Sequence, residues 1–151
     1  MKLTNNIVAA LLLAGMSLVA VACGDGDERD KAEAAAKAFA EAYFNYDIAK
    51  AAQFCTDDSQ RWLRFVASNV YGADLEVLRG MEAGATVDID DIDMADGDSM
   101  AVATVRVGGY MQRDTIGKAG RVVADGEFRL GLVRCGGEWK VRMEALPRSG
   151  R

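Results

Sequence analysis

The sequence contains no histidine, and this absence excludes more chemistry than any other feature of its composition. Without imidazole the chain cannot form a Ser-His-Asp or Cys-His arrangement, and it has no histidine base that titrates near neutral pH. It also lacks a ligand that the common zinc and haem sites use. Histidine-based catalysis and the usual histidine-bound metal centres are therefore excluded.

Cysteine is also scarce: Cys23, Cys55 and Cys135 are the only three, and they form no C-x-x-C pair. The missing motif argues against dithiol redox catalysis. Acidic side chains outnumber basic ones by 23 to 18, which gives a net charge of −5. Because phosphate groups repel such a chain, nucleic acid is excluded as a partner.

The longest apolar run is IVAALLLAGMSLVAVA at residues 7–22, which is shorter than the roughly 20 residues that a spanning helix needs. Lys2 precedes it and small residues end it, as in a secretory signal peptide. The segment AVAC that ends at Cys23 resembles the lipobox of bacterial lipoproteins, although alanine stands where that motif usually has leucine. The resemblance implies that residues 1–22 are removed and that Cys23 is acylated.

The charge on either side of this stretch indicates its orientation. Positive charge normally marks the cytoplasmic flank of a membrane segment, whereas GDGDERD at residues 24–30 is acidic. Acyl chains on Cys23 then anchor the protein to the exported side of a bacterial membrane, either the outer membrane or the periplasmic face, with surface exposure left open. An ordinary signal peptide and a short retained anchor are the alternatives. We interpret residues 23–30 as lipidated terminus and tether, 31–147 as one domain and 148–151 as a tail.

The first half of the domain has helical periodicity, with apolar residues recurring at spacings of three and four. Acidic residues in a first turn, an aspartate cap and a glycine stop are the usual boundary signals of helices. The expected segments are a long helix at 27–45, a short helix at 46–55 capped by Asp47, a third at 60–72 that ends at Gly72, and one or two turns within 73–84.

From Ala85 onward the sequence alternates with a period of two, as strands do. TVDIDDIDM has one extra residue at Asp90–Asp91, which indicates a β-bulge. ADGD and Gly136–Gly137 are expected hairpin turns. Gly108–Gly109 inside a strand indicates a bend or a close backbone approach. Asp125–Gly126 fits either a turn or the interior of a long strand.

Helices followed by an antiparallel meander predict an α+β fold, with N-terminal helices packed on a curved antiparallel sheet of about four strands. The lipobox, the alanine-rich helix, the CTDDS break and the closing GGEWKV hairpin together resemble a known group. These are small bacterial lipoproteins of unknown function with a nuclear transport factor 2-like, cystatin-type fold. The resemblance implies a cone-shaped domain whose sheet and helices enclose a pocket. It supplies no reaction, because one fold carries many functions.

Large apolar and aromatic side chains are the candidates to line such a pocket and to bind a small apolar ligand. Residues of this kind at helical or strand spacing more commonly form hydrophobic core, so both interpretations stay open. The candidates are Trp62, Phe65, Tyr71, Tyr110, Phe128, Trp139 and Met143.

A histidine-free enzyme of the isomerase or dehydratase type is an alternative. Tyr71 or Tyr110 would then donate a hydrogen bond, and Asp91 or Asp93 would be the carboxylate. The acids in DIDDIDMADGD more simply solvate an outer face, so no residue receives a catalytic role. Their spacing does not match an EF-hand loop, and neither a metal site nor a cofactor is predicted.

Acylation of Cys23 leaves Cys55 and Cys135, an even number of thiols that allows one disulfide. Paired thiols become disulfides in exported compartments, and the chain-entropy model gives roughly 4.5 kcal/mol for a loop of about 80 residues. The alternative is two separate small apolar residues, because sequence does not show whether the Cα atoms approach within about 7 Å.

These features together predict a non-catalytic lipoprotein of the cell envelope, anchored in a membrane, that binds a small apolar ligand or an envelope protein. A structural envelope component is a further alternative. Such a component acts only through its outer surface, for example as a homodimer through an exposed sheet face.

Replacing Cys23 by serine tests the lipid anchor. Because lipoprotein maturation requires the thiol, we expect the Cys23→Ser variant to accumulate as unprocessed precursor in the membrane fraction of its bacterial host. Mass spectrometry of the membrane fraction measures this directly. Cys135→Ser is the matched control and should mature normally. Normal maturation of Cys23→Ser would contradict the lipid attachment.

Overall fold

The structure is a computed structural model that describes residues 24–97 and 99–150. The predicted signal peptide, residues 1–22, and the predicted lipid attachment at Cys23 lie outside the described residues. None of the helices in the part that is described is both long enough and apolar enough to cross a bilayer.

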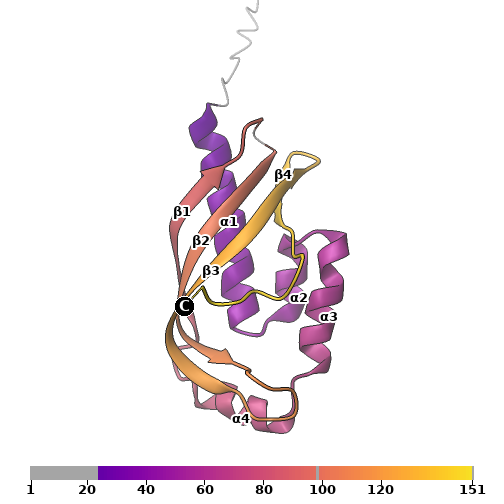
Figure 1. Cartoon of the computed structure of the whole chain (residues 1–151), viewed down its shortest axis with the longest axis vertical. Helices are drawn as coiled ribbons and strands as arrows, with labels where there is room; N and C mark the ends of the chain where they lie inside the picture. The colour runs from indigo at the N-terminus through magenta and orange to yellow at the C-terminus, as the bar shows by residue number, and fades with distance from the viewer. Residues whose placement is uncertain (1–23, 98, 151) are drawn as a thin grey trace, which may run out of the picture.

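Within the described residues the chain changes from helix to strand once, which confirms the predicted α+β class (Figure 1). The helical elements are α1 (Asp25–Phe44), α2 (Ile48–Ala51), the 3-10 turns Ala52–Phe54 and Asp57–Ser59, α3 (Gln60–Ser68) and α4 (Gly72–Gly80). The strands are β1 (Thr86–Met94), β2 (Met100–Gln112), β3 (Arg121–Cys135) and β4 (Glu138–Val141).

The helix boundaries follow the predicted caps with one exception. Asp47 caps α2 as predicted, because its carboxylate accepts a hydrogen bond from the Lys50 amide at 3.1 Å. The prediction that Gly72 ends the third helix is wrong, since α3 ends at Ser68 and Gly72 begins α4. Asn69 stops α3 instead: its side-chain amide donates to the Phe65 carbonyl at 2.8 Å and satisfies a carbonyl of the last turn.

The four strands form one antiparallel sheet in the order β1-β2-β3-β4. A register shift between Ile89 and Asp91 confirms the predicted bulge. Gly136 and Gly137 have φ values of 59° and 85°, the left-handed conformation that a two-residue hairpin turn requires, and so confirm the turn between β3 and β4. Asp125–Gly126 is not a turn, because both residues lie inside β3 and pair with β2.

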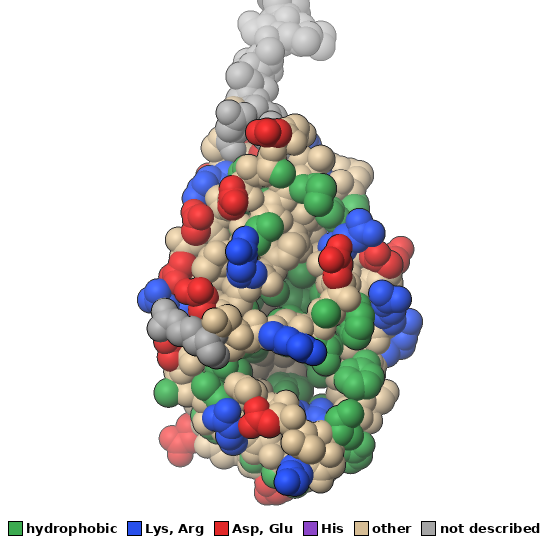
Figure 2. All heavy atoms as spheres, viewed as in Figure 1, with side chains coloured by type: hydrophobic (Ala, Val, Ile, Leu, Met, Phe, Trp, Pro, Cys, Tyr) green, Lys and Arg blue, Asp and Glu red, His purple; other side chains and the backbone are tan. Residues whose placement is uncertain are grey.

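The sheet bends sharply at Gly108–Gly109, as the sequence indicates. Gly109 has a φ of 59°, and beyond it the last part of β2 turns away together with the first part of β3 (Figure 1). This bent end of the sheet and α4 form a lower layer, separate from the layer that contains α1 and α3. Figure 2 shows the surface hollowed between the two layers, with hydrophobic side chains around the opening.

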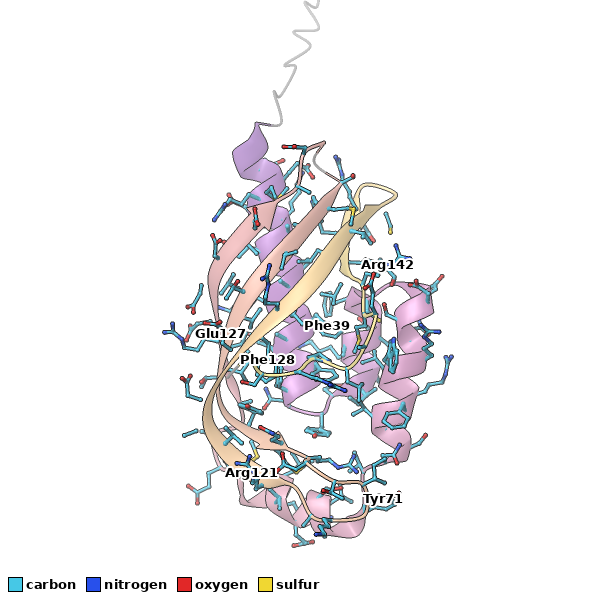
Figure 3. All side chains as sticks on the ribbon, viewed as in Figure 1. Phe39, Tyr71, Arg121, Glu127, Phe128 and Arg142 are labelled. Carbon is cyan, nitrogen blue, oxygen red and sulfur yellow. The ribbon has the colours of Figure 1, made fainter. Side chains whose placement is uncertain are left out.

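The core lies where α1 packs against the sheet. Small residues on α1 allow this close contact, and Ala32, Ala36 and Ala40 are fully buried together with Phe39. Phe39 and Phe128 lie between helix and sheet in Figure 3. At the end of α1 an aromatic cluster, Phe44, Tyr110 and Phe128, completes the core with ring centroids 4.6 to 5.6 Å apart.

Residues 139–144 alternate between buried and unburied side chains, as predicted, and the buried ones complete the core beside β4. Trp139, Val141 and Met143 are buried there. Lys140, Arg142 and Glu144 are not buried.

The absence of a side chain at Gly126 brings Tyr110 against β3, since a Cβ there would overlap the Tyr110 ring. We expect Gly126→Ala to destabilise the domain by about 1–3 kcal/mol, the usual cost of overpacking. Equilibrium urea unfolding measures the change. Gly131→Ala in the same strand is the control, because its Cβ makes only an ordinary contact of 3.5 Å with the Arg142 carbonyl. Equal stability of the two variants would contradict the role of Gly126.

Candidate functional site

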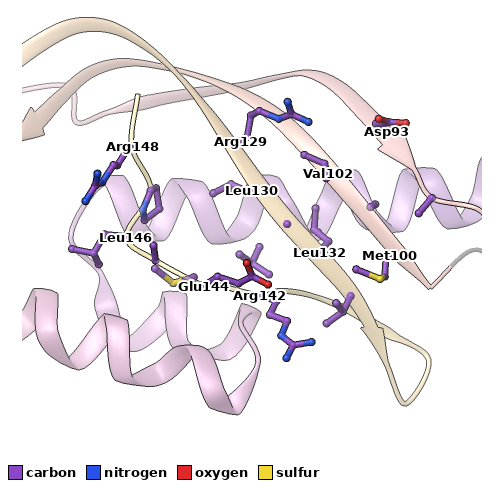
Figure 4. A pocket seen from close by; sticks show the side chains of 18 residues that line it. Asp93, Met100, Val102, Arg129, Leu130, Leu132, Arg142, Glu144, Leu146 and Arg148 are labelled. Atoms are coloured by element: carbon purple, nitrogen blue, oxygen red, sulfur yellow. The ribbon is translucent and has the colours of Figure 1, made fainter. Parts of the chain in front are cut away.

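A groove of about 470 Å³ lies beside β3, under the segment that follows β4 (Figure 4). The Arg142 amide donates to the Gly131 carbonyl, and the Gly150 amide donates to the Glu127 carbonyl, both at 2.9 Å. Between these two bonds the C-terminal segment is longer than the stretch of β3 that it accompanies. It therefore bows away from the strand and leaves the groove beneath it.

The groove has apolar walls and a charged rim. Leu130, Leu132 and Leu146 are among its apolar lining residues, which Figure 4 labels. The Met143 amide donates to the Ser59 hydroxyl at 2.7 Å, which fixes the C-terminal wall. The charged lining residues are Arg129, Arg142 and Arg148 together with Asp93 and Glu144. Arg142 Nε lies 3.4 Å from Asp58 Oδ2, so Arg129 and Arg148 are the basic groups that remain at the rim for an anionic group of a ligand.

The structure does not gather the predicted lining residues into one cavity. Met143 borders the groove, but Tyr110 and Phe128 fill the space under the sheet as core residues. Gly126 contributes to this packing, because the absence of a Cβ there lets the Tyr110 ring lie against β3.

Two of the predicted pocket-lining residues, Phe65 and Tyr71, are exposed. Phe65 is 44% exposed, since α3 turns Leu63 and Val66 inward instead. Tyr71 is 47% exposed and lies just before α4. Trp62 is half-buried, and its indole Nε1 has no hydrogen-bond acceptor among the described residues.

Trp139 belongs to a polar contact that the sequence did not predict. Its Nε1 donates to Glu28 Oε2 at 2.9 Å, while Lys31 Nζ is 3.3 Å from Oε1 and Arg134 Nε is 3.4 Å from Oε2. Glu28 is only 6% exposed. The Trp139 hydrogen bond is the main cause of a lowered pKa for Glu28, opposed by burial and supported by Lys31 and Arg134. The cluster joins the start of α1 to β4.

The structure corrects the interpretation of residues 23–30 as a tether. Residues 25–30 form the first turns of α1, and Glu28 connects them to β4. One signal in the sequence points to this contact: Glu28 lies four residues before Ala32 and eight before Ala36, which places it on the buried face of the helix. An acidic residue on the apolar face of a helix indicates that a buried hydrogen-bond donor or basic group lies opposite it.

Cys55 and Cys135 are both free thiols. Cys55 is buried beside Val141, and burial is the main cause of its raised pKa. Cys135 is exposed and pairs with Glu138 at the opposite end of β4. Val141 and Glu138, the neighbours of the two cysteines, are three strand residues apart, which corresponds to about 10 Å. A disulfide allows no more than roughly 7 Å between the Cα atoms of its cysteines. The two cysteines are therefore separate residues, the alternative that the sequence left open.

The residues of the enzyme alternative are dispersed. Asp91 and Asp93 are exposed, and Asp91 pairs with Arg29 at 3.0 Å. The buried carboxylates are Glu28 and Asp74, and both have a lowered pKa. For Asp74, burial is the largest single influence and raises the pKa, but the amides of Tyr71 and Gly120 together with the Arg113 charge lower it further than burial raises it. Among residues 24–97 and 99–150, no group of three cysteine, aspartate or glutamate side chains is placed to hold a metal ion.

The lowered pKa of Glu28 predicts a specific acid sensitivity. Because the folded pKa lies below the unfolded value of about 4.3, Glu28 adds stability above that pH and loses it as the pH falls through the folded pKa. We expect Glu28→Gln to be less stable near neutral pH and to lose less further stability in acid. Thermal unfolding between about pH 7 and pH 2 measures both effects. Glu33→Gln, an exposed position on α1, is the control; parallel pH profiles for wild type and Glu28→Gln would refute the role of the carboxylate.

No protein-family model and no curated protein sequence matches this chain. Among solved structures it is similar to an NTF-2 like protein of unknown function from Shewanella oneidensis MR-1, with 17% identity, a TM-score of 0.48, and coverage of 74% of this chain and 92% of that one. It is also similar to an NTF2 like protein involved in plasmid conjugation, with 18% identity and a TM-score of 0.45 over 83% of this chain and 39% of that one. Both bear the name of the nuclear transport factor 2-like group that the sequence resembles, and neither likeness supplies a function.

Proposed function

We propose that this chain is a non-catalytic binding module of the bacterial cell envelope, anchored through acyl chains on Cys23. Its ligand is a small apolar molecule that occupies the groove between β3 and residues 142–148. The observation that supports this most directly is the groove itself. Its volume of about 470 Å³ falls within the range of roughly 300–1,000 Å³ that small-molecule sites usually have.

The lining of the groove defines the class of ligand further. Val102, Leu146 and Pro147 are half-buried lining residues and provide a surface on which an apolar body loses contact with water. Arg129 and Arg148 add positive charge at the rim. An amphiphile with an apolar body and one anionic group fits both features, because its charged end stays near the solvent beside an arginine.

The electrostatics of the buried carboxylates favours binding over catalysis. An isomerase or dehydratase of the predicted kind needs a carboxylate with a raised pKa in an apolar cavity. Glu28 and Asp74 have lowered pKa values, and both are engaged by hydrogen bonds within the fold. Neither carboxylate lines the groove.

The mass of the protein purified from its own host in mild detergent tests the proposal. We expect the native mass to exceed the denatured mass by that of one small molecule, which denaturation releases. The denatured mass reports the acyl chains on Cys23 separately. A native monomer without added mass would contradict small-ligand binding and would favour a protein partner instead.

A substitution in the groove connects the added mass to this site. Val102 borders the groove and is half-buried, so Val102→Trp should fill part of its volume. We expect the ligand to bind at least about tenfold more weakly, and the ligand-bound fraction in native mass spectra to fall accordingly. Val122→Trp adds the same side chain at an exposed position outside the groove and is the control. Unchanged occupancy in Val102→Trp would place the ligand elsewhere.

A further inference from the structure

A second polar cluster lies where α4 meets the connection between β2 and β3, and none of its residues lines the groove. Asp74 is fully buried there. Its carboxylate accepts hydrogen bonds from the Tyr71 amide at 3.0 Å and from the Gly120 amide at 2.8 Å. Arg113 Nε is 3.4 Å from Asp74 Oδ2, and the Arg113 side chain is only 13% exposed.

Arg113 keeps an unused hydrogen-bond donor. Its Nε is buried and has no acceptor in the part of the chain that the structure describes. The separation from Asp74 exceeds the roughly 3.2 Å of a normal N–H···O bond, so the pair is an electrostatic contact. Asp114 does not compete for Arg113, because it accepts hydrogen bonds from Gln112 at 2.7 Å and Arg121 at 2.8 Å. A buried donor without an acceptor is rare in folded proteins, where an ordered water, an ion or a ligand usually supplies the missing partner.

Tyr46 brings a phenol into the electrostatic range of this cluster. Burial is the main cause of its raised pKa, which the Arg113 charge opposes and the Asp74 charge increases. The Tyr46 hydroxyl donates to the Met111 carbonyl at 3.4 Å, which places the ring between α1 and the bent end of β2.

Tyr46 has a backbone conformation that glycine normally adopts. Tyr46 has a φ of 60° and is the one non-glycine residue with a positive φ among those described. Its amide donates to the Tyr43 carbonyl and the Asp47 amide donates to the Ala42 carbonyl, the hydrogen bonds of a Schellman motif. Glycine normally occupies this position because other residues meet steric repulsion there. The hydrogen bond from the Tyr46 hydroxyl to the Met111 carbonyl holds the phenol ring in place at this turn.

The cluster lies beside the hollow between the two layers of the domain. The end of α1 and α3 belong to one layer, and α4 and the bent end of β2 belong to the other (Figure 1). Figure 2 shows hydrophobic side chains around the opening and a basic group at its wall. Tyr71 lies at the α4 side of this region in Figure 3, with its ring centroid 5.9 Å from the Arg113 guanidinium carbon. The arginine is therefore flanked by aromatic surface.

We propose that Arg113 binds the carboxylate of a small organic acid whose apolar body lies against Tyr46 and Tyr71. A guanidinium presents its donors in a planar fork that matches the two oxygens of a carboxylate. Asp74 fixes the position of the arginine and is itself satisfied by backbone amides. The inference is independent of the groove beside β3, because the two sites share no residue.

Benzoate and its neutral analogue benzamide test this site on the purified full chain in mild detergent. In NMR spectra of the ¹⁵N-labelled protein, we expect benzoate to shift the Nε–Hε signal of Arg113 in a saturable manner, with a dissociation constant on the order of 1 mM. Benzamide has the same ring but no negative charge, so it should leave this signal in place. Equal shifts with both compounds, or no shift with benzoate, would overturn the proposal. This comparison needs no variant and so does not depend on one folding.

Two substitutions then separate binding from a purely structural role. Arg113→Lys keeps the charge but loses the planar fork, and we expect benzoate to bind at least about tenfold more weakly, as measured by titration of the backbone amide signals. Arg79→Lys on α4 is the control, since Arg79 is exposed and pairs with Glu76 on the same helix. Both variants should unfold with a single cooperative transition. Wild-type affinity for benzoate in a folded Arg113→Lys variant would show that Arg113 does not bind the carboxylate.

Discussion

The Tyr110 ring lies directly against the backbone of β3 at Gly126, and the shape of the domain depends on this contact. The contact occurs where β2 has just passed the bend at Gly108–Gly109. Any side chain at Gly126 would push the ring outward and open the packing of Phe44 and Phe128 around it. The close approach therefore fixes how the core is filled next to the bend.

The bend has a second consequence, because it separates the two sites that we propose. Above it, β3 and the C-terminal segment leave the groove that we propose for an amphiphile. Beyond it, α4 and the bent ends of β2 and β3 form the lower layer (Figure 1), where Asp74 of α4 contacts Arg113 and Gly120. A flat sheet would have no lower layer and hence no hollow. The proposed site at Arg113 therefore depends on the bend, whereas the groove beside β3 depends on the path of the C-terminal segment.

Two buried carboxylates hold the peripheral elements to this frame. Glu28 joins the start of α1 to Trp139 on β4, and Asp74 joins α4 to the amide of Gly120 before β3. Buried ionic groups seldom add much net stability, because their desolvation offsets most of the attraction. Their effect is positional, since each carboxylate is satisfied only when its helix lies in one place. In the case of Asp74, this positioning also sets the orientation of Arg113.

The sequence by itself determined the class of the fold, the order of its elements, the bulge at Asp90–Asp91 and the turn at Gly136–Gly137. These features depend on side-chain periods and turn residues, which act over a few neighbouring positions. Only the tertiary structure decided that Tyr110 and Phe128 form core and that the C-terminal segment shapes a groove. It also showed that Glu28 meets a partner 111 residues away and Asp74 one 46 residues away. Cavities and buried polar contacts arise where distant segments pack together, and no local pattern encodes which segments will meet.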